Sequence, residues 1–265
     1  MTWPFDPGES FVTPERSVEL ERRRRGLTAE EFALPPTMVA TFQGGAYKRL
    51  LERAGLVEAS AREQAQPAGI ALRGESGVGS VDGVPVRVTR LRVGAPAAAL
   101  ALEGAIVRGV RNVLVVGSAG SLQRDLPVGS TVIVTAAERE DGTSHHYLPA
   151  GEVVSADPDL TERLEAAARA RGAAPVRGRS WTIDAPYRET VAAIRRHREA
   201  GVAAVEMEAA AIFAVARVRG IRAALIVAVS DTLFAEWLPG FDDPVYLEAL
   251  TRAADAAMDV AATLR

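Results

Sequence analysis

The chain has 265 residues, of which 48% are hydrophobic and 25% charged, with a formal net charge of −3 at pH 7. This length suits one large domain with a full core, the charge gives no electrostatic basis for nucleic-acid binding, and the absence of cysteine excludes disulfides, thiolate metal sites and a cysteine nucleophile. No apolar run reaches the roughly 18 residues that span a bilayer and the N-terminus lacks a signal-peptide pattern, so we expect a cytoplasmic protein that binds neither nucleic acid nor membrane.

Residues 1–36 are predicted to form a helical extension of the core domain. A threonine–proline pair at residues 13–14 is typical of a helix start, and the helix runs into four arginines at residues 22–25. An arginine run can contact nucleic acid, but the glutamates on the same helix and the preference for cations at a helix C-terminus favour a structural role. Thr28 and Glu31 have the spacing of a second helix start.

The sheet is predicted to begin with an apolar strand over residues 37–42, followed by Gly44 and Gly45 and a helix over residues 46–54. Arg49 lies one turn inside that helix. A strand followed by glycines and a helix N-terminus is typical of an anion site, although many such turns are only tight connections.

Further strands are predicted at residues 69–73 and 79–81, and an Asp-Gly turn then leads into a strand over residues 84–93. A helix over residues 97–108 leaves from Gly94-Ala95-Pro96.

The next apolar strand, residues 112–116, ends in Gly117-Ser118-Ala119-Gly120. Small side chains let a ligand approach the backbone, and the Ser118 hydroxyl with neighbouring amides could hold an anion. The glycine spacing differs from that of a dinucleotide-binding fingerprint.

Another strand is predicted at residues 128–135, before a polar segment that contains His145 and His146. Paired histidines can bind metal, but no cysteine or acidic ligand lies at metal-site spacing, so we expect a structural or substrate-lining role and no metal site. The final helix, residues 244–265, has an apolar stripe that should pack on the sheet.

Residues 202–234 read as strand, helix and strand, with Glu206, Glu208 and Asp231 at the strand exits. In an open α/β sheet, ligands bind beyond the carboxyl ends of the strands, so these carboxylates should face one crevice. We therefore predict a single-domain three-layer α/β/α fold with a central mixed, mostly parallel twisted sheet flanked by helices.

Several motifs together resemble the nucleoside phosphorylase family that contains bacterial purine nucleoside phosphorylase and uridine phosphorylase. They are Gly94-Ala95-Pro96, Gly117-Ser118-Ala119-Gly120, Val205-Glu206-Met207-Glu208-Ala209 and Ser230-Asp231. The match covers residues 37–235 in the family's order, which makes residues 37–265 the phosphorylase-like domain. Segments 141–147 and 182–188 are more similar to the uridine phosphorylase branch.

The resemblance implies that phosphate attacks C1′ of the nucleoside and the base leaves. Glu208 would accept hydrogen bonds from the ribose hydroxyls and stabilise the oxocarbenium-like transition state, with Val205, Glu206 and Met207 beside it. The second catalytic residue that the resemblance implies is Asp231, which would share a proton with N7 of a purine.

Ser230 would lie beside the base as well. Tyr187 and Arg188 could instead stack on and read a uracil. The resemblance therefore favours a purine while leaving uridine open.

The implied phosphate-binding residues are Gly45, Arg49, Gly117, Ser118 and Arg92. Gly45 with Arg49 is similar to the family's early phosphate loop, although Ala46 and Tyr47 replace its middle pair. Val115 and Val78 stand where the family usually carries phosphate-binding arginines. Arg90 and Arg92 could restore the missing charge, or could lie on a solvated strand end.

The resemblance thus implies a pentosyltransferase that needs no cofactor beyond inorganic phosphate as co-substrate. It also implies a homodimer or hexamer with shared active sites. Alternatives are uridine phosphorylase specificity, a nucleosidase of the same fold that uses water, and a non-catalytic nucleoside-binding protein.

Overall fold

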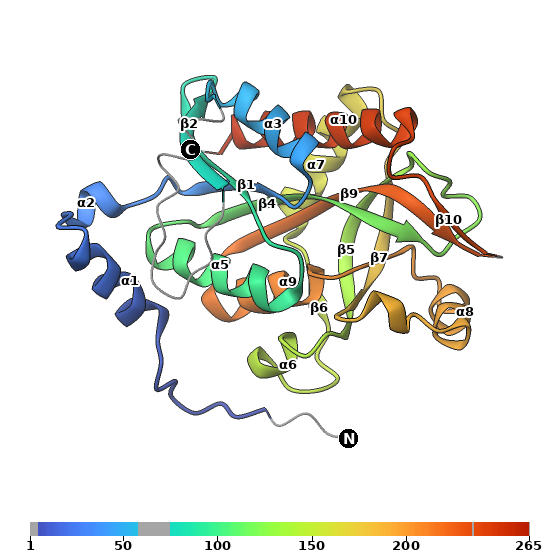
Figure 1. Cartoon of the computed structure of the whole chain (residues 1–265), viewed down its shortest axis with the longest axis horizontal. Coiled ribbons are helices and arrows are strands. Elements are labelled where there is room, and N and C mark those ends of the chain that lie inside the picture. Colours follow the sequence, from blue (N-terminus) through green and yellow to red (C-terminus); the bar gives the residue numbers. More distant parts are fainter. Residues whose placement is uncertain (1–4, 58–74, 235, 265) are drawn as a thin grey trace.

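The computed structural model describes residues 5–57, 75–234 and 236–264, and the strand predicted at residues 69–73 lies outside this part. A central mixed sheet runs through the molecule (Figure 1), as predicted. The strands are β1 (Thr37–Thr41), β2 (Glu75–Val81), β3 (Val84–Arg90), β4 (Asn112–Ser121), β5 (Thr131–Glu140), β6 (Val154–Ser155), β7 (Val176–Ile183), β8 (Ala204–Glu206), β9 (Arg222–Leu233) and β10 (Trp237–Pro239).

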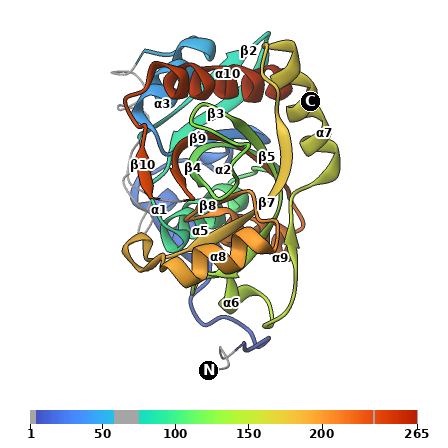
Figure 2. The same cartoon turned by 90° about the vertical axis from the view of Figure 1, so that its right-hand side faces the viewer.

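Helices cover both faces of this sheet. They are α1 (Pro14–Arg24), α2 (Ala29–Phe32), α3 (Gly44–Arg53), α5 (Ala95–Val107), α6 (Ser144–Tyr147), α7 (Pro158–Ala170), α8 (Val191–Glu199), α9 (Ala209–Arg219) and α10 (Pro244–Ala261), with a 3₁₀ turn, η1 (Pro186–Arg188). Figure 2 shows α3, α7 and α10 on one side of the strands and α5, α8 and α9 on the other. None of the helices in the described part is both long and apolar enough to cross a membrane.

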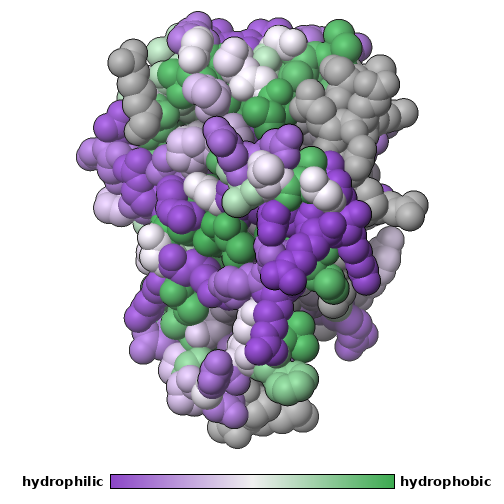
Figure 3. All heavy atoms as spheres, turned by 90° about the vertical axis from the view of Figure 1, so that its left-hand side faces the viewer, coloured by the Kyte–Doolittle hydropathy of each residue, from purple (hydrophilic) through white to green (hydrophobic). Residues whose placement is uncertain are grey.

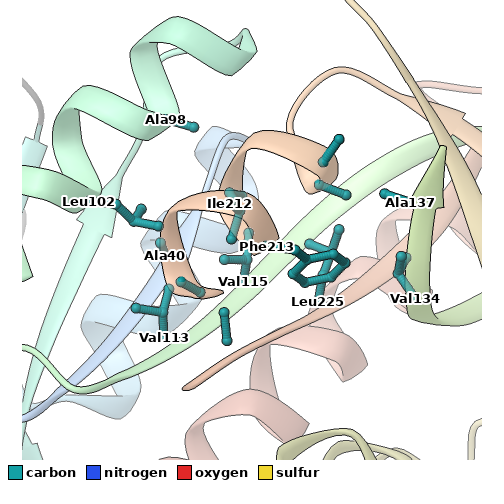
Figure 4. Close-up of a cluster of buried hydrophobic side chains, with 14 of the residues drawn as sticks. Ala40, Ala98, Leu102, Val113, Val115, Val134, Ala137, Ile212, Phe213 and Leu225 are labelled. Atoms are coloured by element: carbon teal, nitrogen blue, oxygen red, sulfur yellow. The ribbon is translucent and has the colours of Figure 1, made fainter. Parts of the chain in front are cut away.

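The two faces of the central strands bury separate cores because successive side chains of a strand point to opposite sides. On β4, Val113 and Val115 face α5 and α9, and Figure 4 shows them packed with Leu102, Ile212 and Phe213. The intervening side chains of β4 pack against α3 and α10 instead. A strand covered on both faces reads as a continuous apolar run, which is why the sequence predicted these strands well.

Part of the sheet closes on itself. Strand β9 pairs with both β4 and β5, and the chain of pairings β5–β7–β8–β4 returns to β9. The register shifts between Ala119 and Gly120 in β4 and between Val134 and Ala136 in β5. Such bulges bend a strand and increase its twist. The closed ring is a feature that the predicted open sheet lacks.

Strand β4 also runs further than predicted. The sequence placed its end at residue 116, but the strand continues through the small residues to Ser121. It pairs with β1 as far as Val116 and with β8 from Gly120 onward. The change of neighbour opens the sheet around Ser118.

The N-terminal segment carries helices at both predicted starts. The capping box of Thr28 and Glu31 is present, and the arginine run sits at the end of α1, where Arg22 and Arg23 pair with Glu19. Figure 3 views the side of the molecule on which α1 and α2 lie, and hydrophilic side chains gather over the middle of that side. The boundary at residue 36 between this segment and the core domain stays a prediction.

Candidate active site

A cavity of about 680 Å³ lies where β4 changes its neighbour from β1 to β8. Its polar wall is formed by Gln43, Ser118, Glu189, Glu206, Glu208, Ser230 and Asp231. Its apolar wall includes Phe42, Val93, Tyr187, Ile194, Val205, Met207, Leu233, Trp237 and Phe241. The crevice at a point where strands diverge is the usual ligand site of an α/β sheet.

Glu206 holds the start of α9 in place. One carboxylate oxygen accepts the backbone N–H groups of Glu208 and Ala209, at 2.7 and 2.6 Å, and the other accepts the hydroxyls of Ser180 and Thr182. Burial raises the pKa of Glu206, and these four donors act in the opposite direction because they favour the charged form. Its lone pairs are committed to the protein, so Glu206 acts chiefly as a support.

Glu208 is the carboxyl group that remains available to a ligand. Its Oε1 accepts the backbone N–H of Gly94 at 2.6 Å, and Gly94 has a φ of 106°, which favours glycine. Burial, followed by the nearby charge of Glu206, raises the pKa of Glu208 to about 8. The Gly94 contact fixes the carboxyl group against the start of α5, where it faces the cavity.

Asp231 lies near the end of β9 and also lines the cavity. Its Oδ1 accepts the Ser230 hydroxyl at 2.7 Å and its Oδ2 accepts the Trp237 indole N–H at 2.9 Å. Gly120 makes this position possible, because a Cβ there would lie 3.1 Å from Asp231 Oδ2 and 2.4 Å from a Leu233 methyl. The chain thus presents an oriented carboxylate next to an aromatic side chain.

Glu189 is a fourth carboxyl group on the cavity wall, and the sequence reasoning missed it. It lies between η1 and α8 and is half-buried. Burial, followed by the charge of Asp231, raises the pKa of Glu189 to about 7. Within the described part of the chain, its carboxyl group has no hydrogen-bond or ion-pair partner. The only sequence signal was an acid directly after segment 182–188, which resembles the uridine phosphorylase branch.

Ser118 lies at the end of the cavity wall nearest α3. Its hydroxyl oxygen accepts the side-chain N–H of Gln43 at 2.7 Å and is hydrogen-bonded to the Tyr246 hydroxyl. Gln43 precedes α3, which begins with Gly44 and Gly45 and has no side-chain cap. A serine hydroxyl and an uncapped helix start are groups that bind anions.

Arg49 does not reach this end of the cavity, contrary to the prediction. Its guanidinium binds both carboxylate oxygens of Asp255 on α10, at 2.8 and 3.1 Å, and Arg53 and Asp259 extend this cluster. The helix turns Arg49 away from the glycines and towards α10. Its charge ties two helices together.

Several other residues singled out in the sequence also lie outside the cavity wall. Arg188 and Arg92 are exposed, and Val115 is buried in the core between β4 and α9. The buried His145 ring faces Arg139 rather than the cavity. Among the described residues, no group of three His, Cys, Asp or Glu side chains is arranged to hold a metal ion.

The cavity therefore brings together residues from distant parts of the sequence. Glu206, Met207 and Glu208 form one side, Ser230 and Asp231 another, and Ser118 the end nearest α3. Gly117 places the backbone beside Ser118, where a Cβ would contact Val227 at 3.4 Å. Tyr187 is fully exposed at the mouth.

The sequence model of the phosphorylase superfamily matches residues 45–264. The chain is 35% identical over 163 residues to a guanosine phosphorylase of Halorubrum lacusprofundi, covering 62% of this chain and 68% of that protein. It is 29% identical over 168 residues to a uridine phosphorylase of Haemophilus influenzae, covering 58% and 67%. It is 29% identical over 166 residues to a DeoD-type purine nucleoside phosphorylase of Bacillus cereus, covering 62% and 71%.

Solved structures show the same fold. A uridine phosphorylase from Vibrio fischeri superposes with a TM-score of 0.77 at 20% identity, covering 90% of this chain and 95% of that one. A purine nucleoside phosphorylase from Toxoplasma gondii in complex with immucillin-H gives a TM-score of 0.73 at 21% identity, with the same coverage.

Proposed function

Because this chain belongs to the phosphorylase superfamily, we propose that it cleaves the N-ribosidic bond of a nucleoside with inorganic phosphate, giving free base and ribose 1-phosphate. The observation that carries this proposal is the cavity in which Glu208, Asp231 and Ser118 meet from three separate elements. Relatives named guanosine, uridine and purine nucleoside phosphorylase support the same chemistry.

Each end of the cavity suits one part of the reaction. A phosphate oxygen near Ser118 forms a bond to C1′ while the bond from C1′ to the base nitrogen breaks and its electrons move into the base. Positive charge develops on the ribose ring, where an ionised Glu208 stabilises it more than it stabilises the ground state. At the far end, Asp231 and Glu189 meet the leaving base.

The two carboxyl groups at the base end favour a purine, and among purines a guanine-type base. Guanine presents the N1–H and N2–H donors that a carboxylate accepts, while its N7 needs a proton as the bond breaks. Glu189 is the acceptor for the N1–H and N2–H groups and is ionised above its pKa of about 7, while Asp231 is the group assigned to N7. A uracil would turn carbonyl oxygens towards them, and Arg188, which was expected to meet those oxygens, is exposed away from the wall.

The test is a panel of guanosine, inosine, adenosine and uridine, each incubated with and without phosphate. We expect base release that requires phosphate and yields ribose 1-phosphate, with guanosine and inosine cleaved faster than uridine. Uridine cleavage in the absence of purine cleavage would contradict the purine assignment. A folded protein that binds nucleosides without turnover would contradict the enzymatic function.

A nucleosidase that uses water is the second candidate. It is favoured by one observation: the described residues that line the cavity include four carboxyl groups and no Arg, Lys or His. Release of free ribose at the same rate with and without phosphate would identify this reaction.

We also propose that copies of the chain associate as a homodimer or hexamer in the cytoplasm, with no cofactor beyond phosphate. The association of copies is supported by aromatic side chains at the cavity mouth. Tyr187 and Trp237 are 100% and 61% exposed, and large exposed apolar groups beside a site mark an interface. Light scattering that gives a monomer mass would contradict the proposal.

A further inference from the structure

A phosphate dianion needs a cation, and the cavity wall does not supply one. The groups that could carry charge among its described lining residues are carboxyl groups, which repel an anion. The Ser118 hydroxyl and the amides at the start of α3 are dipoles, and charge-assisted hydrogen bonds to phosphate are about twice as strong. If the proposed phosphorolysis holds, an arginine or lysine next to this end of the cavity should take part.

Arg90 is placed to do so. It is the last residue of β3 and pairs with Thr41 of β1, directly before the turn into α3. Its Nε lies 3.4 Å from the backbone oxygen of Phe42, which is part of the cavity wall. Its guanidinium lies against Gly44, since a Cβ on that glycine would be 3.6 Å from the guanidinium carbon.

Space is available on the same turn. A Cβ on Gly45 would meet no atom within 4 Å, so the start of α3 is open beside the Arg90 side chain. Gln43, which lies between Phe42 and Gly44 in the sequence, donates a hydrogen bond to the Ser118 hydroxyl at 2.7 Å. The turn from β1 into α3 is therefore in contact with Arg90 of β3 and with the Ser118 hydroxyl of β4.

The present partner of Arg90 can be exchanged. Its Nη1 donates to Glu75 Oε2 at 3.1 Å, and the two side chains are 42% and 31% exposed. Single contacts between partly exposed ions are weak because water screens them. Arg49, by contrast, is held by both oxygens of the nearly buried Asp255 carboxylate.

We propose that Arg90 is the phosphate-binding cation of this site, and that it exchanges Glu75 for a phosphate oxygen when the co-substrate enters beside Ser118. Glu75 then acts as a competing anion that holds Arg90 in the empty enzyme. This inference rests on the proposed phosphorolysis and adds the residue that makes phosphate binding electrostatically favourable.

Two substitutions with opposite expected effects test the inference in steady-state kinetics, with phosphate varied at saturating guanosine and guanosine varied at saturating phosphate. Arg90→Gln should raise the KM for phosphate by about ten-fold or more, the effect of losing one hydrogen bond to a charged group, with little change in the KM for guanosine. Glu75→Gln should lower the KM for phosphate, because Arg90 loses its competitor. The second variant keeps the test valid if the first folds poorly.

Arg217→Gln is the matched control. Arg217 makes the same kind of contacts as Arg90, with one carboxylate, Glu152, and one backbone oxygen, that of Val153, on a partly exposed surface. Its loss should leave the KM for phosphate unchanged.

Failure of the Arg90 role and failure of the proposed function give different results. A phosphate-dependent enzyme in which Arg90→Gln and Glu75→Gln both leave the KM for phosphate unchanged would overturn the role of Arg90 while the function stands. An effect of Arg92→Gln in place of Arg90→Gln would do the same. Wild-type protein that needs no phosphate would overturn the proposed function and this inference together.

Discussion

The Glu206 carboxylate accepts the backbone N–H of Glu208 at 2.7 Å, while the Glu208 carboxyl group turns away from it to Gly94 at 2.6 Å. The two acids are two residues apart and are both buried, yet one faces donors on every side and the other has capacity left for a ligand. Glu206, which holds the backbone in place, and Glu208, which is available to a ligand, are therefore only two positions apart in the sequence.

Glu208→Gln should impair turnover more than folding. The amide keeps the shape of the side chain but not the charge opposite the ribose, and removing a preorganised group of this kind costs about 2.7–4 kcal/mol in the barrier. The rate of guanosine phosphorolysis and the thermal unfolding curve measure the two effects. Glu206→Gln is the comparison, and it should lower the melting temperature because it disturbs four hydrogen bonds. Near-normal turnover in folded Glu208→Gln protein would contradict the assigned role.

The raised pKa of Glu208 predicts how stability depends on pH. Between its ordinary value of 4.5 and about 8, the folded protein keeps a proton that the unfolded chain has released. The free energy of unfolding should therefore fall as pH rises through this window, by up to about 1.4 kcal/mol per pH unit for one group.

Urea unfolding of the wild type and Glu208→Gln at pH 5 to 8 measures this slope, and the difference between the two proteins removes the contribution of Glu189. Parallel stability profiles would show that Glu208 titrates normally. In the opposite direction, kcat/KM should rise as Glu208 ionises towards pH 8, because the carboxylate is the form that stabilises the ribose cation.

Asp231→Asn should slow purine cleavage markedly. The amide can still donate a hydrogen bond to N7 but cannot share a proton with it, and its contacts with Ser230 and Trp237 can be partly retained. Specific activity with inosine, measured beside the melting temperature, separates catalysis from support. A variant that loses stability but keeps its specific activity would show that Asp231 only orders the end of β9.

Glu189→Gln should reduce kcat/KM for guanosine more than for adenosine, because only guanine offers N–H donors at both N1 and N2. The matched change is Glu199→Gln at the exposed C-terminal end of α8, which should alter neither value. Equal losses with both nucleosides would place Glu189 outside base recognition.

Gly120→Ala should lower both stability and activity. The added methyl group would lie 2.4 Å from Leu233 and 3.1 Å from Asp231 Oδ2, and crowding of this kind costs about 1–3 kcal/mol. Gly104→Ala in α5 is the control, since its Cβ meets no atom within 4 Å and alanine stabilises a helix interior by about 1 kcal/mol. Calorimetry should show opposite shifts in melting temperature, and shifts of the same sign would contradict the packing argument.

The sequence predicted the elements whose pattern is local. Continuous apolar runs identified the central strands, and Glu206 and Asp231 were recognisable because each follows such a run, although β9 continues past Asp231 to Leu233. Of the small residues after Val116, Ser118, Ala119 and Gly120 line the cavity, and the strand continues through them to Ser121. These features depend on neighbours within a few residues.

Features that depend on long-range packing were not predictable in the same way. Arg49 seemed well placed by its spacing from the glycines, but its direction was decided by Asp255, 206 residues later. Glu189 gave no pattern of its own, because its burial and its proximity to the charge of Asp231 are set by the fold and not by its sequence neighbours. The closure of the ring required bulges that leave no periodic signal in the sequence.

Part of the cavity wall belongs to the closed ring of β4, β9, β5, β7 and β8, and part belongs to short segments outside it. The two parts should differ in how readily their backbone hydrogen bonds open. Within the ring each strand has a neighbour on either side, so its amides should exchange with solvent only through rare, cooperative opening. Tyr187 and Trp237 belong to the short segments η1 and β10 outside that ring. Hydrogen exchange should therefore be slow around Ser118 and fast around these aromatics, and a nucleoside should enter and leave past η1 and β10 rather than past the strands of the ring.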